Sequence, residues 1–210
     1  MKKKILYENF FPKTFEMDKI LADEETITFI TKPQDTKQIC SIVQSYINKY
    51  ISHEKAVIID ATACIGGDTI AFSKCFHNVI SIEMDKQRYE YLKNNINVYK
   101  LQNVQHIHGN CIDVINKLPY FDIIYFDPPW GGKDYKEHIN LRLSICDIPI
   151  ENLVLDFFDA NKSLCIPKLV VMKLPLNYDL KYITQIIGVD EYNIYLNKLH
   201  KFFIITVERK

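Results

Sequence analysis

The sequence predicts an α/β protein whose mostly parallel, seven-stranded sheet is wound with helices on both faces. From residue 56 onward, short apolar runs alternate with stretches of helical character, which is the pattern of β–α–β units. The runs at 56–60 and 121–126 consist almost entirely of apolar residues, as buried strands do. The last two runs follow one another without a helix between them, so they are expected to form an antiparallel pair.

The expected strands are 56–60, 78–83, 104–108, 121–126, 168–174, 192–196 and 200–207. The expected helices are 35–50, 67–75, 85–100, 150–160 and 178–187. Asp85 is a typical capping residue for the third of these helices. Four side chains then share one face of it at helical spacing: Tyr89, Leu92, Ile96 and Tyr99. Residues 1–34 are rich in Phe and Lys without clear periodicity, so we expect an N-terminal extension of 1–34 on a domain of 35–210.

Composition limits the functions that are open to this chain. Its 26 basic and 26 acidic residues give zero net charge, which argues against a broad nucleic-acid-binding coat. A local patch such as Lys2–Lys4 could still hold a few phosphates, although a solvated, frayed terminus explains it equally well. We expect a monomer.

The cysteines and the apolar runs indicate an intracellular protein. Six cysteines without paired spacing are typical of reduced, mostly buried thiols and predict neither a disulfide framework nor a metal site. Glu8 and Asn9 interrupt the start of the chain too early for a signal peptide. No apolar run approaches the ~20 residues of a membrane span. The expected location is therefore cytoplasmic or nuclear, with no membrane partner.

The most informative stretch is Asp-Pro-Pro-Trp-Gly-Gly at 127–132, directly after the apolar run 121–126. Asp127 offers an acceptor carboxylate, and the carbonyl of Pro128 can accept from an amine. Trp130 supplies a flat face on which a base can stack. Enzymes that methylate exocyclic amino groups of nucleobases need these three functions together. A plain proline turn is the alternative, and the flanking acid and Trp-Gly-Gly make it less suitable.

A second group of residues predicts a cofactor site. Residues 60–69 connect the first strand to its helix, and Gly66 and Gly67 let a ligand approach the backbone closely. The dinucleotide fingerprint G-x-G-x-x-G is absent. Glu83 ends the second strand, where an acid binds a ribose diol in such sheets. Asn110 and Asp113 follow the third strand and could frame an adenine. A ligand with an adenosine and a positive end but no phosphates is S-adenosylmethionine.

With these motifs in order, the chain resembles the class I S-adenosylmethionine-dependent methyltransferases, which have a Rossmann-like fold. More narrowly, it resembles the trimethylguanosine synthases, which methylate the 2-amino group of a 7-methylguanosine RNA cap. The resemblance rests on 60–69, 94–99 and 127–135, with support from 174–177, 196–199 and the N-terminal stretch 15–33. It covers nearly the whole chain, and it implies that the extension 1–34 covers the substrate cleft.

The resemblance and the motifs together assign roles to particular residues. Asp127, Pro128 and Trp130 are the expected catalytic residues, and no metal is expected. The expected cofactor-binding residues are Asp60, Ala63, Cys64, Gly66, Gly67, Thr69, Glu83, Asn110, Asp113 and Asp127. The expected substrate-binding residues are Trp130, Asn95, Lys32, Tyr135 and Asn177.

Three departures from the family's pattern matter. Residues 30–33 read Ile-Thr-Lys-Pro where the family often has Ser-x-Thr-Pro. Leu176 stands where relatives have an arginine for the cap phosphates, so Lys2–Lys4, Lys32 or Lys173 must supply that contact. Asp127 stands where some relatives carry Ser, so it is not an obligatory base.

The expected reaction is therefore methyl transfer from S-adenosylmethionine to 7-methylguanosine-capped RNA or a cap analogue, giving a 2,7-dimethyl or 2,2,7-trimethyl cap. Two alternatives stay open: methylation of an amino group in ribosomal RNA, transfer RNA or DNA, and a catalytically silent cap-binding module. The Asn, Ile, Lys and Tyr bias of the chain suggests an AT-rich coding sequence, as in some parasites or large DNA viruses.

Overall fold

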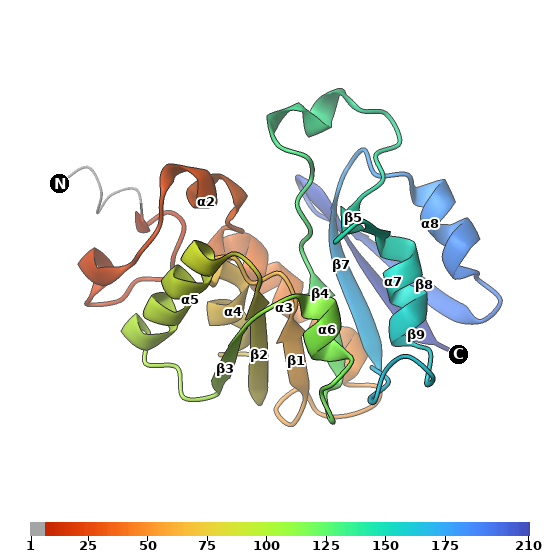
Figure 1. The fold of residues 1–210 in the computed structure, drawn as a ribbon, viewed down its shortest axis with the longest axis horizontal. Coiled ribbons are helices and arrows are strands. Elements are labelled where there is room, and N and C mark those ends of the chain that lie inside the picture. The colour runs from red at the N-terminus through yellow and green to blue at the C-terminus, as the bar shows by residue number, and fades with distance from the viewer. Residues whose placement is uncertain (1–6) are drawn as a thin grey trace. The chain divides into compact units, whose positions relative to one another are not determined.

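The computed structural model describes residues 7–210, with the side chain of Lys133 excepted. The expected basic patch Lys2–Lys4 lies outside the described residues. The chain divides into two compact units, Met1–Val114 and Ile115–Lys210, and Figure 1 shows the elements of each.

The first unit is built on three parallel strands, as expected. Its strands are β1 (Val57–Asp60), β2 (Asn78–Glu83) and β3 (Val104–His108), with β2 paired to both of the others. Its longer helices are α3 (Pro33–Ile47), α4 (Gly67–Phe72) and α5 (Lys86–Val98), and the short α6 (Cys111–Ile115) crosses the unit boundary. Helix α4 packs on β1 and β2, α5 packs on β2 and β3, and α3 packs on α4 (Figure 1).

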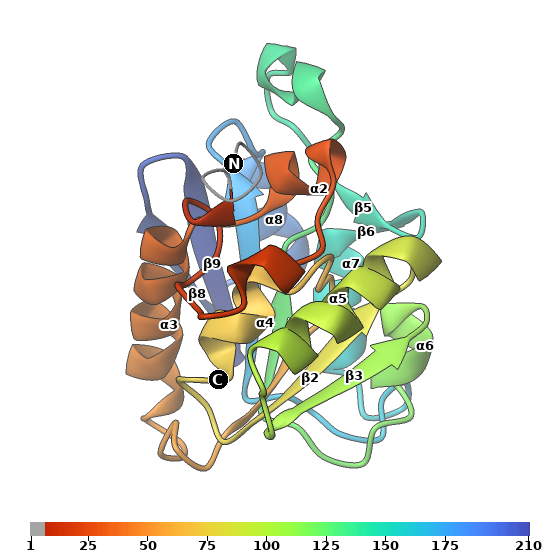
Figure 2. The ribbon, with the colours of Figure 1, turned by 90° about the vertical axis from the view of Figure 1, so that its left-hand side faces the viewer.

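The N-terminal segment contains structure that its sequence did not indicate. A 3₁₀ turn, η1 (Met17–Lys19), precedes the six-residue helix α2 (Glu24–Phe29). Asp23 and Thr26 start α2 with reciprocal hydrogen bonds between side chain and backbone, a capping box. A helix this short has too few turns to show a 3.6-residue period. The N-terminal segment packs through Tyr7, Phe11, Met17 and Ile20 against Ile65, Ile70 and Val98. Figure 2 shows the segment alongside α4 and α5.

The second unit combines a parallel and an antiparallel pairing. Strand β4 (Ile123–Phe126) runs parallel to β7 (Leu169–Pro175), which pairs antiparallel with β9 (Phe202–Arg209), and β9 pairs antiparallel with β8 (Tyr192–Lys198). Its helices are α7 (Ile150–Phe157) and α8 (Leu180–Ile187). The connection from β4 to α7 contains three further short elements: η2 (Lys133–Glu137), β5 (Ser144–Ile145) and β6 (Ile148–Pro149).

The predicted fold class is confirmed: the strands form a seven-stranded, mostly parallel sheet in the order β3-β2-β1-β4-β7-β9-β8, with an antiparallel C-terminal pair. Element ends differ from the predictions in ways that capping explains. The helix expected from residue 178 begins at Leu180, because the carboxylate of Asp179 accepts from the N–H of Tyr182 at 3.0 Å and caps it. The short elements α6, η2, β5 and β6 were not predicted.

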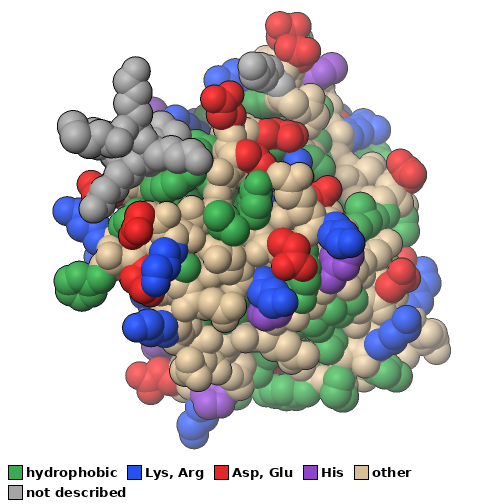
Figure 3. Space-filling view, turned by 60° about the vertical axis from the view of Figure 1, so that its left-hand side comes forward, with side chains coloured by type: hydrophobic (Ala, Val, Ile, Leu, Met, Phe, Trp, Pro, Cys, Tyr) green, Lys and Arg blue, Asp and Glu red, His purple; other side chains and the backbone are tan. Residues whose placement is uncertain are grey.

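Several compositional expectations can be compared with the described residues. None of the six cysteines forms a disulfide, but only Cys40 and Cys111 are buried, so the expectation of mostly buried thiols was wrong. On the face drawn in Figure 3, acidic and basic side chains are interspersed instead of gathering into a basic field. Within residues 7–210, no helix is long and apolar enough to cross a membrane.

Candidate active site

The loop after β1 is shaped by two residues with left-handed backbone. Cys64 has a φ of 48° and Gly66 a φ of 96°. The N–H of Gly66 donates to the carbonyl of Ala63 at 2.8 Å, and the N–H of Ala63 donates to the carbonyl of Ile82 in β2 at 3.0 Å. Glycine adopts this backbone without strain, so the loop turns tightly and α4 begins at Gly67.

Glu83, at the end of β2, holds this loop in place. One of its carboxylate oxygens accepts from the N–H of Cys64 at 2.9 Å, and the other accepts from the N–H of Asp85 at 2.7 Å. Such charge-assisted bonds are stronger than bonds between neutral groups. Each carboxylate oxygen has more than one lone pair, so Glu83 can also accept from ribose hydroxyls.

Asp60 and Thr69 form a buried pair below the loop. Asp60 is 1% exposed and Thr69 is fully buried. The hydroxyl of Thr69 donates to Oδ2 of Asp60 at 2.6 Å and lies 2.8 Å from the hydroxyl of Ser81. Thr69 therefore orients Asp60 from inside the protein, and we assign it a positioning role.

The N-terminal segment is fastened to the cofactor loop by Asn95 of α5. The fully buried Asn95 amide accepts from the N–H of Leu21 and donates to the carbonyls of Leu21 and Ile65, each at 2.9 Å. The hydroxyl of Thr31 donates to Oδ2 of Asp68 at 2.9 Å. Asn95 was expected near the cap or the cofactor, which stays a prediction, and its amide joins the backbone of the N-terminal segment to that of the loop after β1.

Gly67 is where the N-terminal segment comes closest to the loop. A Cβ at position 67 would lie 2.5 Å from Cγ1 of Ile30. Gly67→Ala is therefore expected to displace Ile30 and the segment that carries it, at a cost of ~1–3 kcal/mol of unfolding free energy, which is typical of overpacking. Thermal unfolding and calorimetric titration with S-adenosylmethionine measure the two consequences, lower stability and weaker cofactor binding.

The added variant Ile30→Ala provides the control for this prediction. It removes the obstructing atoms, so the double variant is expected to be more stable than the sum of the two single effects. A Gly67→Ala protein as stable as the wild type would contradict the close approach of Ile30.

The expected adenine-binding residues lie at the end of β3. The side-chain oxygen of Asn110 accepts from the N–H of Ile112 at 2.9 Å and so caps α6. Asp113 is exposed on α6. Their contact with an adenine stays a prediction, as does the substrate role of Lys32, which is exposed before the first turn of α3.

The Asp-Pro-Pro-Trp motif begins where β4 ends. Pro128 is buried and Pro129 is exposed. The carboxylate of Asp127 is 17% exposed, and its Oδ2 accepts from the ammonium of Lys173 at 2.5 Å. The Lys173 side chain is only 6% exposed, so its position does not suit the phosphate-binding role that its sequence context suggested.

Trp130 packs against the ring of Tyr135 and lies near the ammonium group of Lys173. The ring of Tyr135 meets it edge-on, with centroids 5.1 Å apart and planes at 70°, and the Lys173 ammonium lies 5.5 Å from the Trp130 centroid. The indole N–H is buried and has no hydrogen-bond partner in the described part of the chain. Trp130 and Tyr135, two predicted substrate residues, are thus brought together.

Asn177 fixes the loop that carries Tyr135. Its side-chain amide donates to the backbone carbonyls of Tyr135 at 2.7 Å and His138 at 2.8 Å, and its backbone carbonyl accepts from the N–H of Leu141. Asn177 was expected to bind substrate, which stays a prediction, and these bonds hold the loop that carries Tyr135. Neighbouring Leu176 is 41% exposed and carries no charge.

Sequence reasoning missed two buried partners in this unit. The hydroxyl of Tyr178 donates to the carboxylate of Glu151, and both side chains are buried. Burial, and then the neighbouring Glu151, raise the pKa of Tyr178 well above its ordinary value, so the hydroxyl stays protonated and keeps donating. The other missed partner is Lys173. Both belong to contacts between distant segments, for which a single sequence carries no signal.

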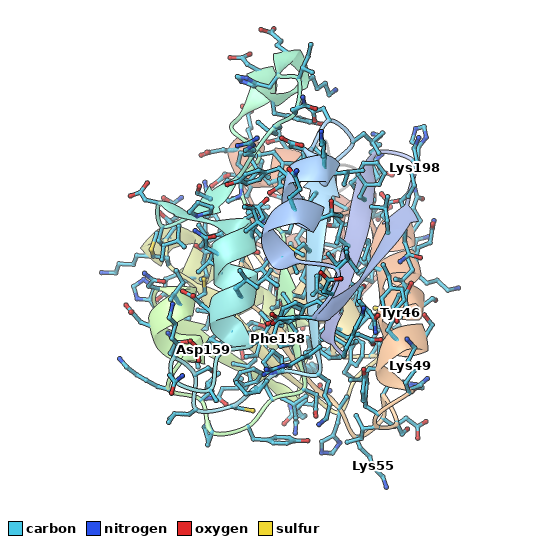
Figure 4. All side chains as sticks on the ribbon, turned by 90° about the vertical axis from the view of Figure 1, so that its right-hand side faces the viewer. Tyr46, Lys49, Lys55, Phe158, Asp159 and Lys198 are labelled. Atoms are coloured by element: carbon cyan, nitrogen blue, oxygen red, sulfur yellow. The ribbon has the colours of Figure 1, made fainter. Side chains whose placement is uncertain are left out.

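A hollow of about 350 Å³ lies elsewhere in this unit. Phe158, Asp159 and Arg209 are among its lining residues, and Figure 4 labels Phe158 and Asp159 at the lower end of α7. Arg209 ends β9 two residues beyond Val207, which pairs with Val170 near the start of β7, and the start of β7 lies beside the start of β4. The hollow is therefore at the opposite end of β4 from Asp127. Within residues 7–210, no cluster of three or more His, Cys, Asp or Glu could hold a metal ion.

The chain is similar to known methyltransferases. Residues 55–201 match the family described as RNA cap guanine-N2 methyltransferase. An uncharacterised protein of Acanthamoeba polyphaga mimivirus is 32% identical over 95% of this chain and 84% of its own. The ribosomal RNA small subunit methyltransferase J of Francisella philomiragia is 25% identical over 85% of this chain and 80% of its own.

Solved structures share the fold at low sequence identity. The precorrin-6y C5,15-methyltransferase of Geobacter metallireducens has a TM-score of 0.61 at 14% identity, over 92% of this chain and 95% of that one. A Streptococcus mutans protein in complex with SAH has a TM-score of 0.56 at 13% identity, over 86% and 99%. Because the family model matches more than half of its length, this chain belongs to the family described as RNA cap guanine-N2 methyltransferase and is an S-adenosylmethionine-dependent methyltransferase.

Proposed function

We propose that this protein methylates the exocyclic 2-amino group of a 7-methylguanosine RNA cap. The observation that carries the proposal is the Asp-Pro-Pro-Trp motif at the end of β4, in a chain that matches the cap guanine-N2 family over 55–201. A nearly coplanar amine needs acceptors for its hydrogens and a flat surface for its ring. Asp127 and Pro128 provide the acceptors, and Trp130 provides the surface.

The residues of the first unit suit the cofactor. The loop of residues 63–67 ends in two glycines, which have no side chain to keep a ligand from the backbone, and its neighbours Asp60 and Glu83 are acidic. These acids complement a cationic sulfonium and amino group and repel a pyrophosphate. Bound S-adenosylmethionine supplies an electrophilic methyl group on a sulfonium that needs no further activation. We propose that Glu83 accepts from the ribose hydroxyls and that residues 63–67 hold the methionine end.

The protein's own contribution to catalysis is then alignment. Holding two reacting groups in the reactive geometry can lower a barrier by ~7–11 kcal/mol. We propose that the Asp127 carboxylate and the Pro128 carbonyl accept from the two amine hydrogens and so turn the nitrogen lone pair toward the methyl group. As the N–C bond forms, the methyl C–S bond breaks, its electron pair stays on sulfur, and S-adenosylhomocysteine is the leaving group. The methylated nitrogen is then acidic, so its proton passes to water without a strong base.

Trp130 gives a reason for preferring a capped end. The 7-methylguanine ring is cationic, and a cation on a tryptophan face gains ~0.5–2 kcal/mol over a neutral ring. The sole tryptophan of the chain would thereby distinguish 7-methylguanine from guanine.

A second candidate follows from the Francisella relative, whose name assigns it to small-subunit ribosomal RNA. Transfer of a labelled methyl group from S-adenosylmethionine separates the two candidates. The acceptors are 7-methylguanosine diphosphate, guanosine diphosphate and deproteinised small-subunit ribosomal RNA. We expect label on the methylated nucleotide and little on plain guanosine diphosphate. Label on ribosomal RNA that excess 7-methylguanosine diphosphate does not reduce would replace the proposal with the second candidate.

A further inference from the structure

Lys173 is a buried lysine in the middle of a predicted reaction site. It lies in β7, 5% exposed, in a strand whose seven residues are all buried. In the pairing of β7 with β9, Lys173 lies opposite the apolar Ile204. Its ammonium lies 5.1 Å from the centroid of the Phe202 ring. A lysine is almost never buried this deeply unless it is paired. Its place in the sheet therefore calls for a specific partner.

That partner is Asp127. Strands β4 and β7 run parallel with Phe126 beside Met172, so the next residues along, Asp127 and Lys173, come side by side at the strand ends. The ammonium donates to Oδ2 of Asp127 at 2.5 Å and stands 5.5 Å from the centroid of the Trp130 ring. One lysine thus lies beside two of the three residues expected to be catalytic, Asp127 and Trp130.

Burial makes this pair sensitive to the loss of either member. Removing one partner of a buried ion pair leaves an uncompensated charge, which is strongly destabilising, whereas removing both is often neutral. The ammonium also restricts the rotation of the Asp127 carboxylate, because a charge-assisted bond prefers one geometry. The direction in which Asp127 can accept from a substrate amine is then set by Lys173.

We propose that Lys173 is a positioning residue for methyl transfer, which fixes the Asp127 carboxylate and compensates its charge beneath the target amine. This inference rests on the proposed function, because it takes Asp127 as the acceptor of the amine hydrogens. It differs from the phosphate-binding role that Lys173 could have had at the surface. A positioning residue acts on the rate of the bound complex, whereas a phosphate ligand acts on the binding of the substrate.

The test compares Lys173→Met, Lys173→Gln and Lys168→Met in steady-state transfer to 7-methylguanosine diphosphate and to ribosomal RNA. Misplacement of a reacting group by about 1 Å can cost ~10²-fold in rate, so Lys173→Met is expected to lower kcat by ~10- to 100-fold. KM for both substrates is expected to change by less than ~3-fold. Lys173→Gln keeps an N–H donor for Asp127 and is expected to recover part of kcat. Lys168, exposed before β7, serves as the matched control and is expected to behave as wild type.

A double variant covers the case in which Lys173→Met does not fold. Asp127→Asn with Lys173→Met leaves no unpaired charge, and residues that act through one another have non-additive effects. Its kcat is therefore expected to be no lower than that of Asp127→Asn alone.

Each remaining outcome decides against the proposal in a recognisable way. Wild-type kcat in folded Lys173→Met, or additive losses in the double variant, would overturn the role of Lys173 while the proposed function stands. A raised KM for the nucleotide with unchanged kcat in Lys173→Met would indicate that Lys173 binds phosphate instead of positioning Asp127. If the wild-type protein methylates ribosomal RNA but not 7-methylguanosine diphosphate, cap specificity is overturned. The role of Lys173 is then tested by the same comparison of kcat with ribosomal RNA as the acceptor. Transfer by wild type to neither acceptor would remove both proposals.

Discussion

Replacing Asn95 with alanine is expected to cause a large loss of stability. The variant would leave the N–H of Leu21 and the carbonyls of Leu21 and Ile65 without their present partner, in a place where Asn95 itself is fully buried. An unsatisfied buried polar group costs ~1–3 kcal/mol, so three of them cost at least ~3 kcal/mol. For a chain of this size that lowers Tm by ~6–12 °C.

The same variant should also bind S-adenosylmethionine more weakly, because Ile65 belongs to the loop that is proposed to hold the cofactor. Thermal unfolding with and without the cofactor measures both effects. Asn97→Ala is the matched control, since it makes the same chemical change at an exposed position of the same helix. It is expected to change the free energy of unfolding by less than ~0.5 kcal/mol. Equal Tm values for the two variants would contradict the fastening role of Asn95.

Replacing Trp130 with alanine is expected to weaken binding of 7-methylguanosine diphosphate by ~5- to 150-fold, which corresponds to the ~1–3 kcal/mol of a base stacked on an aromatic ring. Trp130→Phe keeps a ring and should lose less. Binding of S-adenosylmethionine should stay unchanged in both variants, because its expected contacts are made by other residues. Calorimetric titration with each ligand measures these affinities.

The wild-type protein offers an independent measure of the same contact. Trp130 is the sole tryptophan of the chain, so its fluorescence reports on this site alone. Stacking of a cationic purine is expected to quench it at concentrations that match the calorimetric affinity. Unchanged nucleotide affinity in Trp130→Ala, or no quenching in the wild type, would remove Trp130 from the proposed cap site.

The order and type of the main elements could be predicted because each depends on local pattern. Strands β2 and β3 lie at the expected residues, and α5 begins after the expected cap at Asp85, whose carboxylate accepts from the N–H of Arg88 at 2.8 Å. The turn at Gly66 also follows from a short motif, the pair of glycines after β1. Such features need only the residues within a few positions of one another.

The contacts of Asn95, Asn177 and Lys173 could not be predicted, because each joins residues that are far apart in the sequence. Asn95 bonds to a residue 74 positions away, Asn177 to one 42 positions away, and Lys173 to one 46 positions away. A polar residue in a motif suggests ligand binding when its neighbours in space are unknown. The structure shows that Asn95 and Asn177 each donate to backbone carbonyls and that Lys173 donates to Asp127, contacts that a single sequence does not reveal.

The central claim is that the methyl group goes to the 2-amino group of 7-methylguanine, and one pair of acceptors tests it directly. The protein is incubated with S-adenosylmethionine and either 7-methylguanosine diphosphate or 7-methylinosine diphosphate, which lacks only that amino group. Mass spectrometry then measures the nucleotides. We expect the guanosine compound to gain the mass of one methyl group, or of two if a second transfer follows, and the inosine compound to gain none. Equal gains on both would place the methyl group elsewhere and contradict the proposal.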